Sequence, residues 1–157
     1  MNKNKLDAAA ETILELAHAN WEFGAASLTP EGVDIMERGV RITQHVCHKF
    51  ARHSGWWQEY DEMPEKYRKY FIGTKLALVH SEASEALEGV RKNLPDDHLP
   101  HRPMGEVEAA DVIIRLLDLA GAMGWDVAGA MIEKLAYNQQ RPDHKPEARQ
   151  GDGGKTM

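Results

Sequence analysis

The chain has 157 residues, 42% of them hydrophobic and 28% charged, and its formal net charge is −6. This length is sufficient for one domain with a hydrophobic core. The negative charge argues against a nucleic-acid polymer as the partner, because proteins that bind such polymers usually present a basic face to the phosphates. No run of about 18 apolar residues occurs, so we expect no membrane span. The single cysteine, Cys47, cannot form an internal disulfide, which favours a reducing compartment and makes the cytoplasm the predicted location.

The first half of the sequence is dominated by helix signals. In residues 5–20 apolar side chains recur every three or four positions, which is typical of an amphipathic helix, and we assign residues 1–28 to an N-terminal helical extension. The sequence Thr-Pro-Glu at 29–31 predicts the start of a second helix. It supplies a capping hydroxyl, a proline in the first turn and an acid at the positive end of the helix dipole. We expect this helix to end near Arg52.

The middle of the sequence has a mixed pattern. Residues 54–64 begin with Ser-Gly and contain two tryptophans and a proline, so we expect an irregular aromatic segment followed by a short helix over 65–71. Gly-Thr at 73–74 predicts a break and a new cap. From 75 to 92 the apolar residues return to helical spacing.

The last part of the chain continues the helical pattern. Residues 93–105 are rich in proline, aspartate and histidine and predict a loop, whereas residues 106–123 form a helix that is apolar nearly all round, which implies burial on more than one side. A final helix is expected over 126–140, and the polar, glycine-rich segment 143–157 is expected to be a flexible tail. We therefore predict a single all-α domain, a helical bundle, over residues 1–142.

Two acid pairs on successive helices carry the chemistry. Glu82 and Glu85 form one pair, and Glu108 and Asp111 form the other; a spacing of three places both carboxylates of a pair on one helix face. A loop of about a dozen residues allows the two helices to lie antiparallel, so the four carboxylates can converge. A single such pair is usually only a solvated face, but the second pair interrupts the most apolar segment of the chain. Ligands that are all oxygen suit Mg²⁺, with Mn²⁺ as a substitute.

Basic and amide side chains follow on the last helix. Lys134, Asn138 and Arg141 share a face near its C-terminal end, and together they can hold phosphate oxygens. The alternative is a basic helix end that is favoured by the helix dipole. Lys75 lies two turns before Glu82 on the same face, where it either contacts phosphate or neutralises the acids.

The stretches LALVHSEASEALEGVR, EAAD and KLAYNQQRPDHK together resemble the MazG-like all-α nucleotide pyrophosphohydrolases. The family pattern is E-x-x-E, a gap, E-x-x-D, and then a lysine–asparagine–arginine set; no single motif is decisive, but their order and spacing are fairly specific. The resemblance covers roughly residues 39–141. It implies a helical bundle that forms a homodimer or a homotetramer. It also implies Mg²⁺-dependent cleavage of a nucleoside triphosphate, ribo- or deoxyribo-, to the monophosphate and pyrophosphate.

The resemblance also implies roles for particular residues. The metal ligands would be Glu82, Glu85, Glu108 and Asp111, and the phosphate contacts Lys134, Asn138 and Arg141. Many family members have two adjacent glutamates at the start of the first motif, but here Ser81 precedes Glu82, so one helper acid is absent. The group that activates the attacking water is therefore left open, with Glu85 and Glu82 as the candidates.

Recognition of the base is assigned to aromatic and polar side chains before the first acid pair. Trp56 and Trp57 can stack on a base, and Gln44, His45 and His48 can reach base edges from the helix before them. The alternative places the tryptophans in the core or an interface and the histidines on the surface.

Two other functions fit an acidic helical bundle. A carboxylate-bridged di-iron bundle usually needs Glu-x-x-His on two helices, and the sequence has one instance, Glu15–His18, away from the acid pairs. A non-catalytic regulatory or interaction bundle would show no metal dependence and would tolerate changes at the four acids.

Overall fold

The structure is a computed structural model that describes residues 30–140. Its helices are α2 (Pro30–His53), α3 (Gln58–Glu62), α4 (Glu65–Lys92), α5 (Met104–Met123) and α6 (Val127–Gln140). No strand occurs in this range, and an isolated bridge between Pro95 and Pro103 lies in the loop before α5. The predicted all-α class is therefore confirmed for the described chain.

The described chain divides into two compact units. One is Val40–Val127, and the other contains residues 30–39 and 128–140. The candidate acids and tryptophans all belong to the Val40–Val127 unit. The single catalytic domain over residues 1–142 stays a prediction, and the N-terminal extension (1–28) and the tail (143–157) lie outside the described residues.

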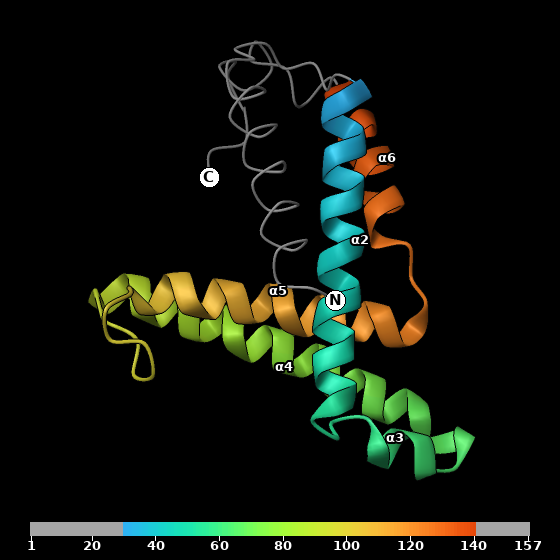
Figure 1. Cartoon of the computed structure of the whole chain (residues 1–157). Coiled ribbons are helices and arrows are strands. Elements are labelled where there is room, and N and C mark those ends of the chain that lie inside the picture. The colour runs from blue at the N-terminus through green and yellow to red at the C-terminus, as the bar shows by residue number, and fades with distance from the viewer. Residues whose placement is uncertain (1–29, 141–157) are drawn as a thin grey trace, which may run out of the picture. The chain divides into compact units, whose positions relative to one another are not determined.

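Helices α4 and α5 form an antiparallel hairpin in which they pack side by side (Figure 1). Helix α4 ends at Asn93, which adopts the left-handed conformation with φ of 50°. One turn earlier, a Cβ added at Gly89 would lie 2.8 Å from Cβ of Met104. A side chain at Gly89 would therefore collide with the start of α5, and the glycine lets the two helix ends approach closely.

The loop between these helices is held by a buried aspartate. Asp96 is 3% exposed, and its Oδ1 accepts hydrogen bonds from the backbone N–H groups of His98, at 2.9 Å, and Leu99, at 2.6 Å. Such side-chain to backbone bonds stabilise a turn locally. The loop predicted for residues 93–105 is thus an ordered connection that fixes the hairpin.

Helix α4 corrects the prediction of a break at residues 73–74, because it runs unbroken from Glu65 to Lys92. The Thr74 hydroxyl donates to the carbonyl oxygen of Tyr70 one turn back, at 3.1 Å, instead of capping a new helix. A glycine such as Gly73 costs a helix about 1 kcal/mol relative to alanine, which packing against α5 outweighs. Helix α3 was not predicted; it is a single short helix within the aromatic segment.

The core of the Val40–Val127 unit is built around the C-terminal half of α5. Its fully or nearly fully buried apolar side chains are Trp57, Leu117, Leu119 and Ala120. The middle of α5 differs, because Ile113 is 54% and Ile114 is 47% exposed. Continuous burial of successive residues, as expected all round this helix, is thus seen only over residues 117–120.

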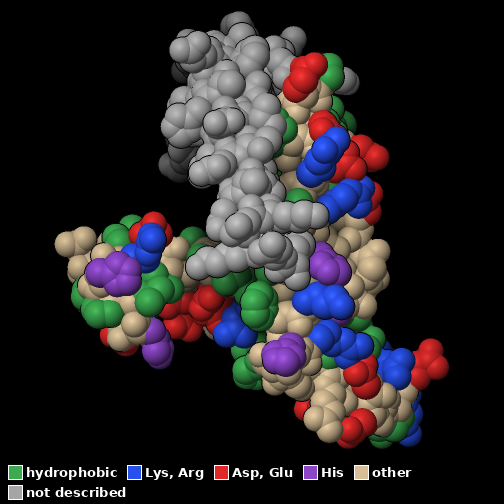
Figure 2. Space-filling view, viewed as in Figure 1, with side chains coloured by type: hydrophobic (Ala, Val, Ile, Leu, Met, Phe, Trp, Pro, Cys, Tyr) green, Lys and Arg blue, Asp and Glu red, His purple; other side chains and the backbone are tan. Residues whose placement is uncertain are grey.

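The surface carries charges of both signs, and Figure 2 shows a group of acidic side chains on the α4–α5 hairpin. None of the helices in the described range combines the length and the apolar character that crossing a membrane requires.

Candidate metal centre

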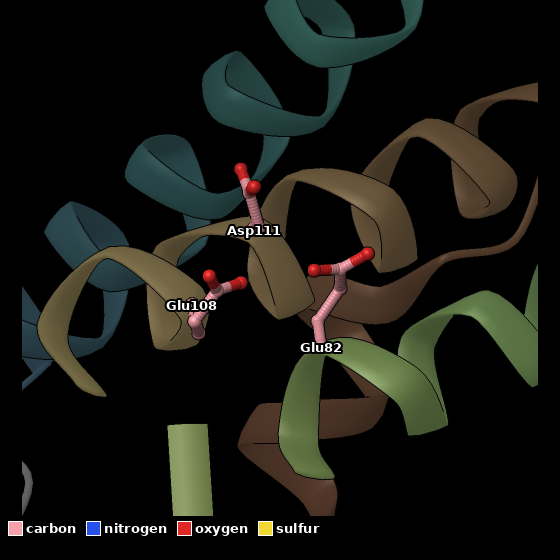
Figure 3. A group of neighbouring side chains, drawn as sticks. All are labelled: Glu82, Glu108 and Asp111. Atoms are coloured by element: carbon pink, nitrogen blue, oxygen red, sulfur yellow. The ribbon is translucent and has the colours of Figure 1, made fainter. Parts of the chain in front are cut away.

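Three of the four predicted metal ligands converge between α4 and α5. Glu82 on α4 faces Glu108 and Asp111 on α5 (Figure 3), and one carboxylate oxygen from each lies within 4.8 Å of the others. Glu82 is 6% and Glu108 8% exposed, while Asp111 is half-buried. We call these three residues the acid group.

The fourth predicted ligand, Glu85, lies at the edge of this arrangement. Its side chain is exposed, and it is not one of the three converging carboxylates. Its charge is nevertheless close enough to raise the pKa of Glu108. Glu85 is one turn further along α4 than Glu82, so it faces the same site from a position open to water.

The carboxylates of the acid group and of Glu85 act on one another electrostatically. Burial, a hydrogen bond to Glu82 and the charges of Glu85, Glu82 and Asp111 raise the pKa of Glu108 to about 7. A carboxyl group that holds its proton near neutral pH is the expected response to several neighbouring carboxylates in a partly dehydrated site. Metal-free protein would therefore hold a proton at Glu108 that a divalent cation could replace.

The donor set fits a hard divalent cation. Carboxylate oxygens are the preferred ligands of Mg²⁺, which commonly binds one or two carboxylates and keeps several waters. Two buried carboxylates together with the half-buried Asp111 supply such ligands, and Glu85 beside them is exposed to water. No histidine belongs to the group, so a di-iron site of the Glu-x-x-His kind has no support among the described residues.

A cation of the chain itself already touches the acid group. Nε of Arg115 lies 2.7 Å from Oε1 of Glu82. Arg115 is 41% exposed, and it comes from α5, one turn after Asp111. One of the two buried carboxylates is thus paired within the chain.

Two turns after Asp111 on α5, Asp118 is the centre of a buried polar network. Its Oδ1 accepts a hydrogen bond from Nε1 of Trp57 at 2.7 Å and lies 3.0 Å from Nδ1 of His48, and its Oδ2 lies 3.6 Å from Nζ of Lys75. Burial and the negative charge of Asp118 raise the pKa of Cys47, so the thiol is kept protonated. The network links side chains of α2, α4, α5 and the aromatic segment 54–64 to one another.

The two candidate stacking residues have different surroundings. Trp57 is 1% exposed, and its ring contacts His48, Tyr60 and Phe71 at centroid distances of 5.4–5.7 Å. Trp57 is therefore a core residue, which was the alternative left open by the sequence. Trp56 is 69% exposed, so stacking on a base stays a prediction for Trp56 alone.

The polar residues proposed for base edges lie on the C-terminal half of α2. Nε2 of Gln44 donates a hydrogen bond to the backbone oxygen of Trp125 at 3.0 Å, whereas His45 is exposed. Contact of either side chain with a base stays a prediction.

The candidate phosphate-binding residues are spread over both units. Nζ of Lys75 is 4.7 Å from the centroid of the Trp57 ring, and its side chain is 17% exposed, so it is engaged by Asp118 and aromatic rings. Lys134 lies over the Tyr137 ring in the other unit, where Oδ1 of Asn138 is buried without a hydrogen-bond partner among the described residues. Arg141 lies outside the described residues. Phosphate binding by these residues stays a prediction.

Two charged residues of the site, Arg115 and Asp118, were not predicted from the sequence. A usable signal existed, because Glu108, Asp111, Arg115 and Asp118 are spaced by three, four and three, which places all four on one face of α5. Charged residues that recur on one face of an otherwise apolar helix indicate a polar stripe between helices.

A shallow pocket of about 450 Å³ lies elsewhere in the unit, along α3. It is lined by Gly55, Gln58, Glu59, Glu62 and Met63. None of the acid-group residues lines it, so it has no bearing on a metal centre.

Comparison with known proteins yields no match to a family model, to a curated protein or to a solved structure. The resemblance to the MazG-like pyrophosphohydrolases therefore rests on the motifs and their spacing.

Proposed function

We propose that the protein is a Mg²⁺-dependent nucleotide pyrophosphohydrolase that converts a nucleoside triphosphate to the monophosphate and pyrophosphate. The observation that carries the proposal is the convergence of Glu82, Glu108 and Asp111 from two antiparallel helices, with two of them buried. Acidic residues on a merely solvated helix face would have exposed carboxylates that lie apart from one another. The order of the sequence motifs, which resembles that of the nucleotide pyrophosphohydrolases, supports the type of reaction.

The acid group would hold the cation. When bound, a divalent cation neutralises phosphate oxygens and lowers the pKa of a coordinated water. Glu108 would release its proton as the cation binds, because the added positive charge removes the reason for its raised pKa. Glu85, exposed to water and next to the group, is placed to accept a proton from the attacking water.

The exposed apolar side chains of the hairpin support an assembly of two or more copies. Leu87 is 60% and Val90 72% exposed on α4, and Ile113 and Ile114 are about half exposed on α5. Contiguous exposed apolar surface is uncommon on monomers and usually marks an interaction site. We propose that a second copy covers these side chains in a homodimer, or within a homotetramer. A cytoplasmic location completes the proposal.

The test is a screen of the common ribo- and deoxyribonucleoside triphosphates with Mg²⁺ or Mn²⁺ and detection of pyrophosphate. Pyrophosphate release from at least one nucleotide is expected, and Asp111→Asn should abolish it. Glu88→Gln is the matched control, because Glu88 lies on α4 but pairs with Arg91 and Lys92 instead of joining the acid group. Absence of pyrophosphate from every nucleotide would contradict the proposal and favour the non-catalytic bundle.

A further inference from the structure

The ion pair between Arg115 and Glu82 lies at the acid group itself, because it uses a carboxylate that the proposed cation also needs. The Glu82 side chain is 8% exposed, and Nε of Arg115 contacts its Oε1 at 2.7 Å. Among the described residues, Arg115 forms no other ion pair. A buried carboxylate needs a cation or a proton nearby, and in the absence of metal this guanidinium provides the charge.

A divalent cation and the guanidinium compete for the same carboxylate. Two positive charges beside one carboxylate repel each other, so occupation of the acid group by metal weakens the ion pair between Glu82 and Arg115. Arg115 is 41% exposed and has a long, flexible side chain. Its head group can therefore leave Glu82 toward water without disrupting the packing of α5.

The released guanidinium suits the substrate of such a site. Arginine presents five N–H donors in a planar fork that matches phosphate oxygens and can bind them in a bidentate manner. Arg115 lies one turn from Asp111, so a phosphate held by a metal in the acid group would lie within its reach.

We propose that Arg115 is an exchangeable counter-ion: it neutralises Glu82 in the metal-free protein and binds a phosphate oxygen of the substrate once a divalent cation occupies the acid group. The inference rests on the proposed function for its metal and phosphate ligands. It assigns a role in binding to a residue outside the acid pairs.

The first part of the test measures Mn²⁺ binding alone, by calorimetry on the full-length chain. Arg115→Gln should bind Mn²⁺ about tenfold more tightly than the parent, because one charge-assisted bond no longer competes for Glu82. Arg102→Gln is the matched control, since Arg102 also lies 2.7 Å from a glutamate, Glu106, but both side chains of that pair are about half exposed. Its Mn²⁺ affinity should equal that of the parent.

The second part measures binding of inorganic pyrophosphate to the Mn²⁺-saturated protein. Arg115→Gln should bind pyrophosphate about tenfold more weakly, which is the size of effect expected for one lost charge-assisted bond. Arg115→Lys keeps a charge beside Glu82 and so protects the fold, but it loses the bidentate fork. Its affinities for both ligands should lie between those of the parent and Arg115→Gln.

The opposite signs of the two effects identify the exchange. If Arg115 had only a structural role, its replacement would leave both affinities unchanged or weaken both, and either result would overturn the inference. Binding of Mn²⁺ by the parent would then still support the metal site. If neither the parent nor Arg115→Gln binds Mn²⁺, the acid group is no cation site, and the proposed function fails together with the inference.

Discussion

At the scale of single residues, Glu108 determines how the metal-free protein responds to pH. Its pKa is raised from 4.5 to about 7 in the folded chain, so the folded state holds a proton that the unfolded state releases. The contribution of Glu108 to the free energy of unfolding is therefore greatest below pH 4.5, and it is lost as the pH rises through 7.

This pH dependence can be measured by urea unfolding of the metal-free protein from pH 4.5 to 8. Glu108→Gln removes the titrating group, so the variant should lose less stability over this range and should be more stable than the parent at pH 8. Mg²⁺ should stabilise the parent more at pH 8 than at pH 5, because the cation needs an ionised carboxylate. Parallel stability curves for parent and variant would contradict the coupling within the acid group.

Asp118 gives a second prediction at this scale, concerning the buried network. Asp118→Ala leaves the indole N–H of Trp57 and the ammonium of Lys75 without their acceptor. Loss of one partner from a buried charged network typically costs about 3–5 kcal/mol. Thermal or urea unfolding should show a loss of this order. Asp61→Ala, which removes an exposed ion pair with Arg52, should cost at most about 1 kcal/mol.

Trp56 supplies a prediction about the substrate. If its exposed ring stacks on the base, Trp56→Ala should weaken nucleotide binding by about 1–3 kcal/mol, while Mn²⁺ binding stays unchanged. The measurement is the Michaelis constant for the nucleotide found in the screen. An unchanged Michaelis constant would remove Trp56 from the site. Trp57→Ala is not a useful counterpart, because it would empty part of the core.

At the scale of helices, the two glycines within α4 should respond in opposite directions to the same substitution. An added Cβ at Gly73 meets nothing within 4 Å, so Gly73→Ala should stabilise the protein by about 1 kcal/mol through helix propensity. An added Cβ at Gly89 lies 2.8 Å from Cβ of Met104, so Gly89→Ala should destabilise it by about 1–3 kcal/mol. Urea unfolding of both variants provides the measurement. Equal effects would show that α4 and α5 do not approach closely at this end.

Much of the helical architecture could be predicted from the sequence, because apolar spacing and turn residues are local signals. The break expected at Gly73-Thr74 failed for a tertiary reason, since packing of α4 on α5 outweighs the local preference for a turn. Convergence of three of the acids followed from their spacing of three and from the short connection between the helices.

Other features of the site depend on the tertiary structure and could not be predicted from the sequence. Spacing cannot show that Glu85 lies exposed while Glu82 is buried, or that Arg115 reaches across to α4. Adjacent tryptophans cannot be told apart by composition either. Trp57 is identified as a core residue by its burial, by its ring contacts and by its hydrogen bond to Asp118, a residue 61 positions away.

At the scale of the whole molecule, the exposed apolar side chains of the hairpin predict association. If a second copy covers Val90 and Ile113, light scattering at micromolar concentration should give the mass of a dimer or tetramer. Val90→Glu would place a charge in a desolvated interface, so it should shift the mass toward that of a monomer. Tyr67→Glu, at an exposed position in the first turn of α4, serves as the control. A monomeric parent would contradict the prediction.

The proposed function requires that the acid group bind a divalent cation. The direct test is the shift in melting temperature caused by Mg²⁺ in the parent, in Asp111→Asn and in the control Glu88→Gln. Mg²⁺ at a hundred times its dissociation constant should stabilise the parent and the control by about 2.7 kcal/mol. Asp111→Asn should be no less stable than the parent without metal, because carboxylate repulsion falls, and it should gain far less from Mg²⁺. Equal Mg²⁺-induced shifts in all three proteins would contradict the metal site.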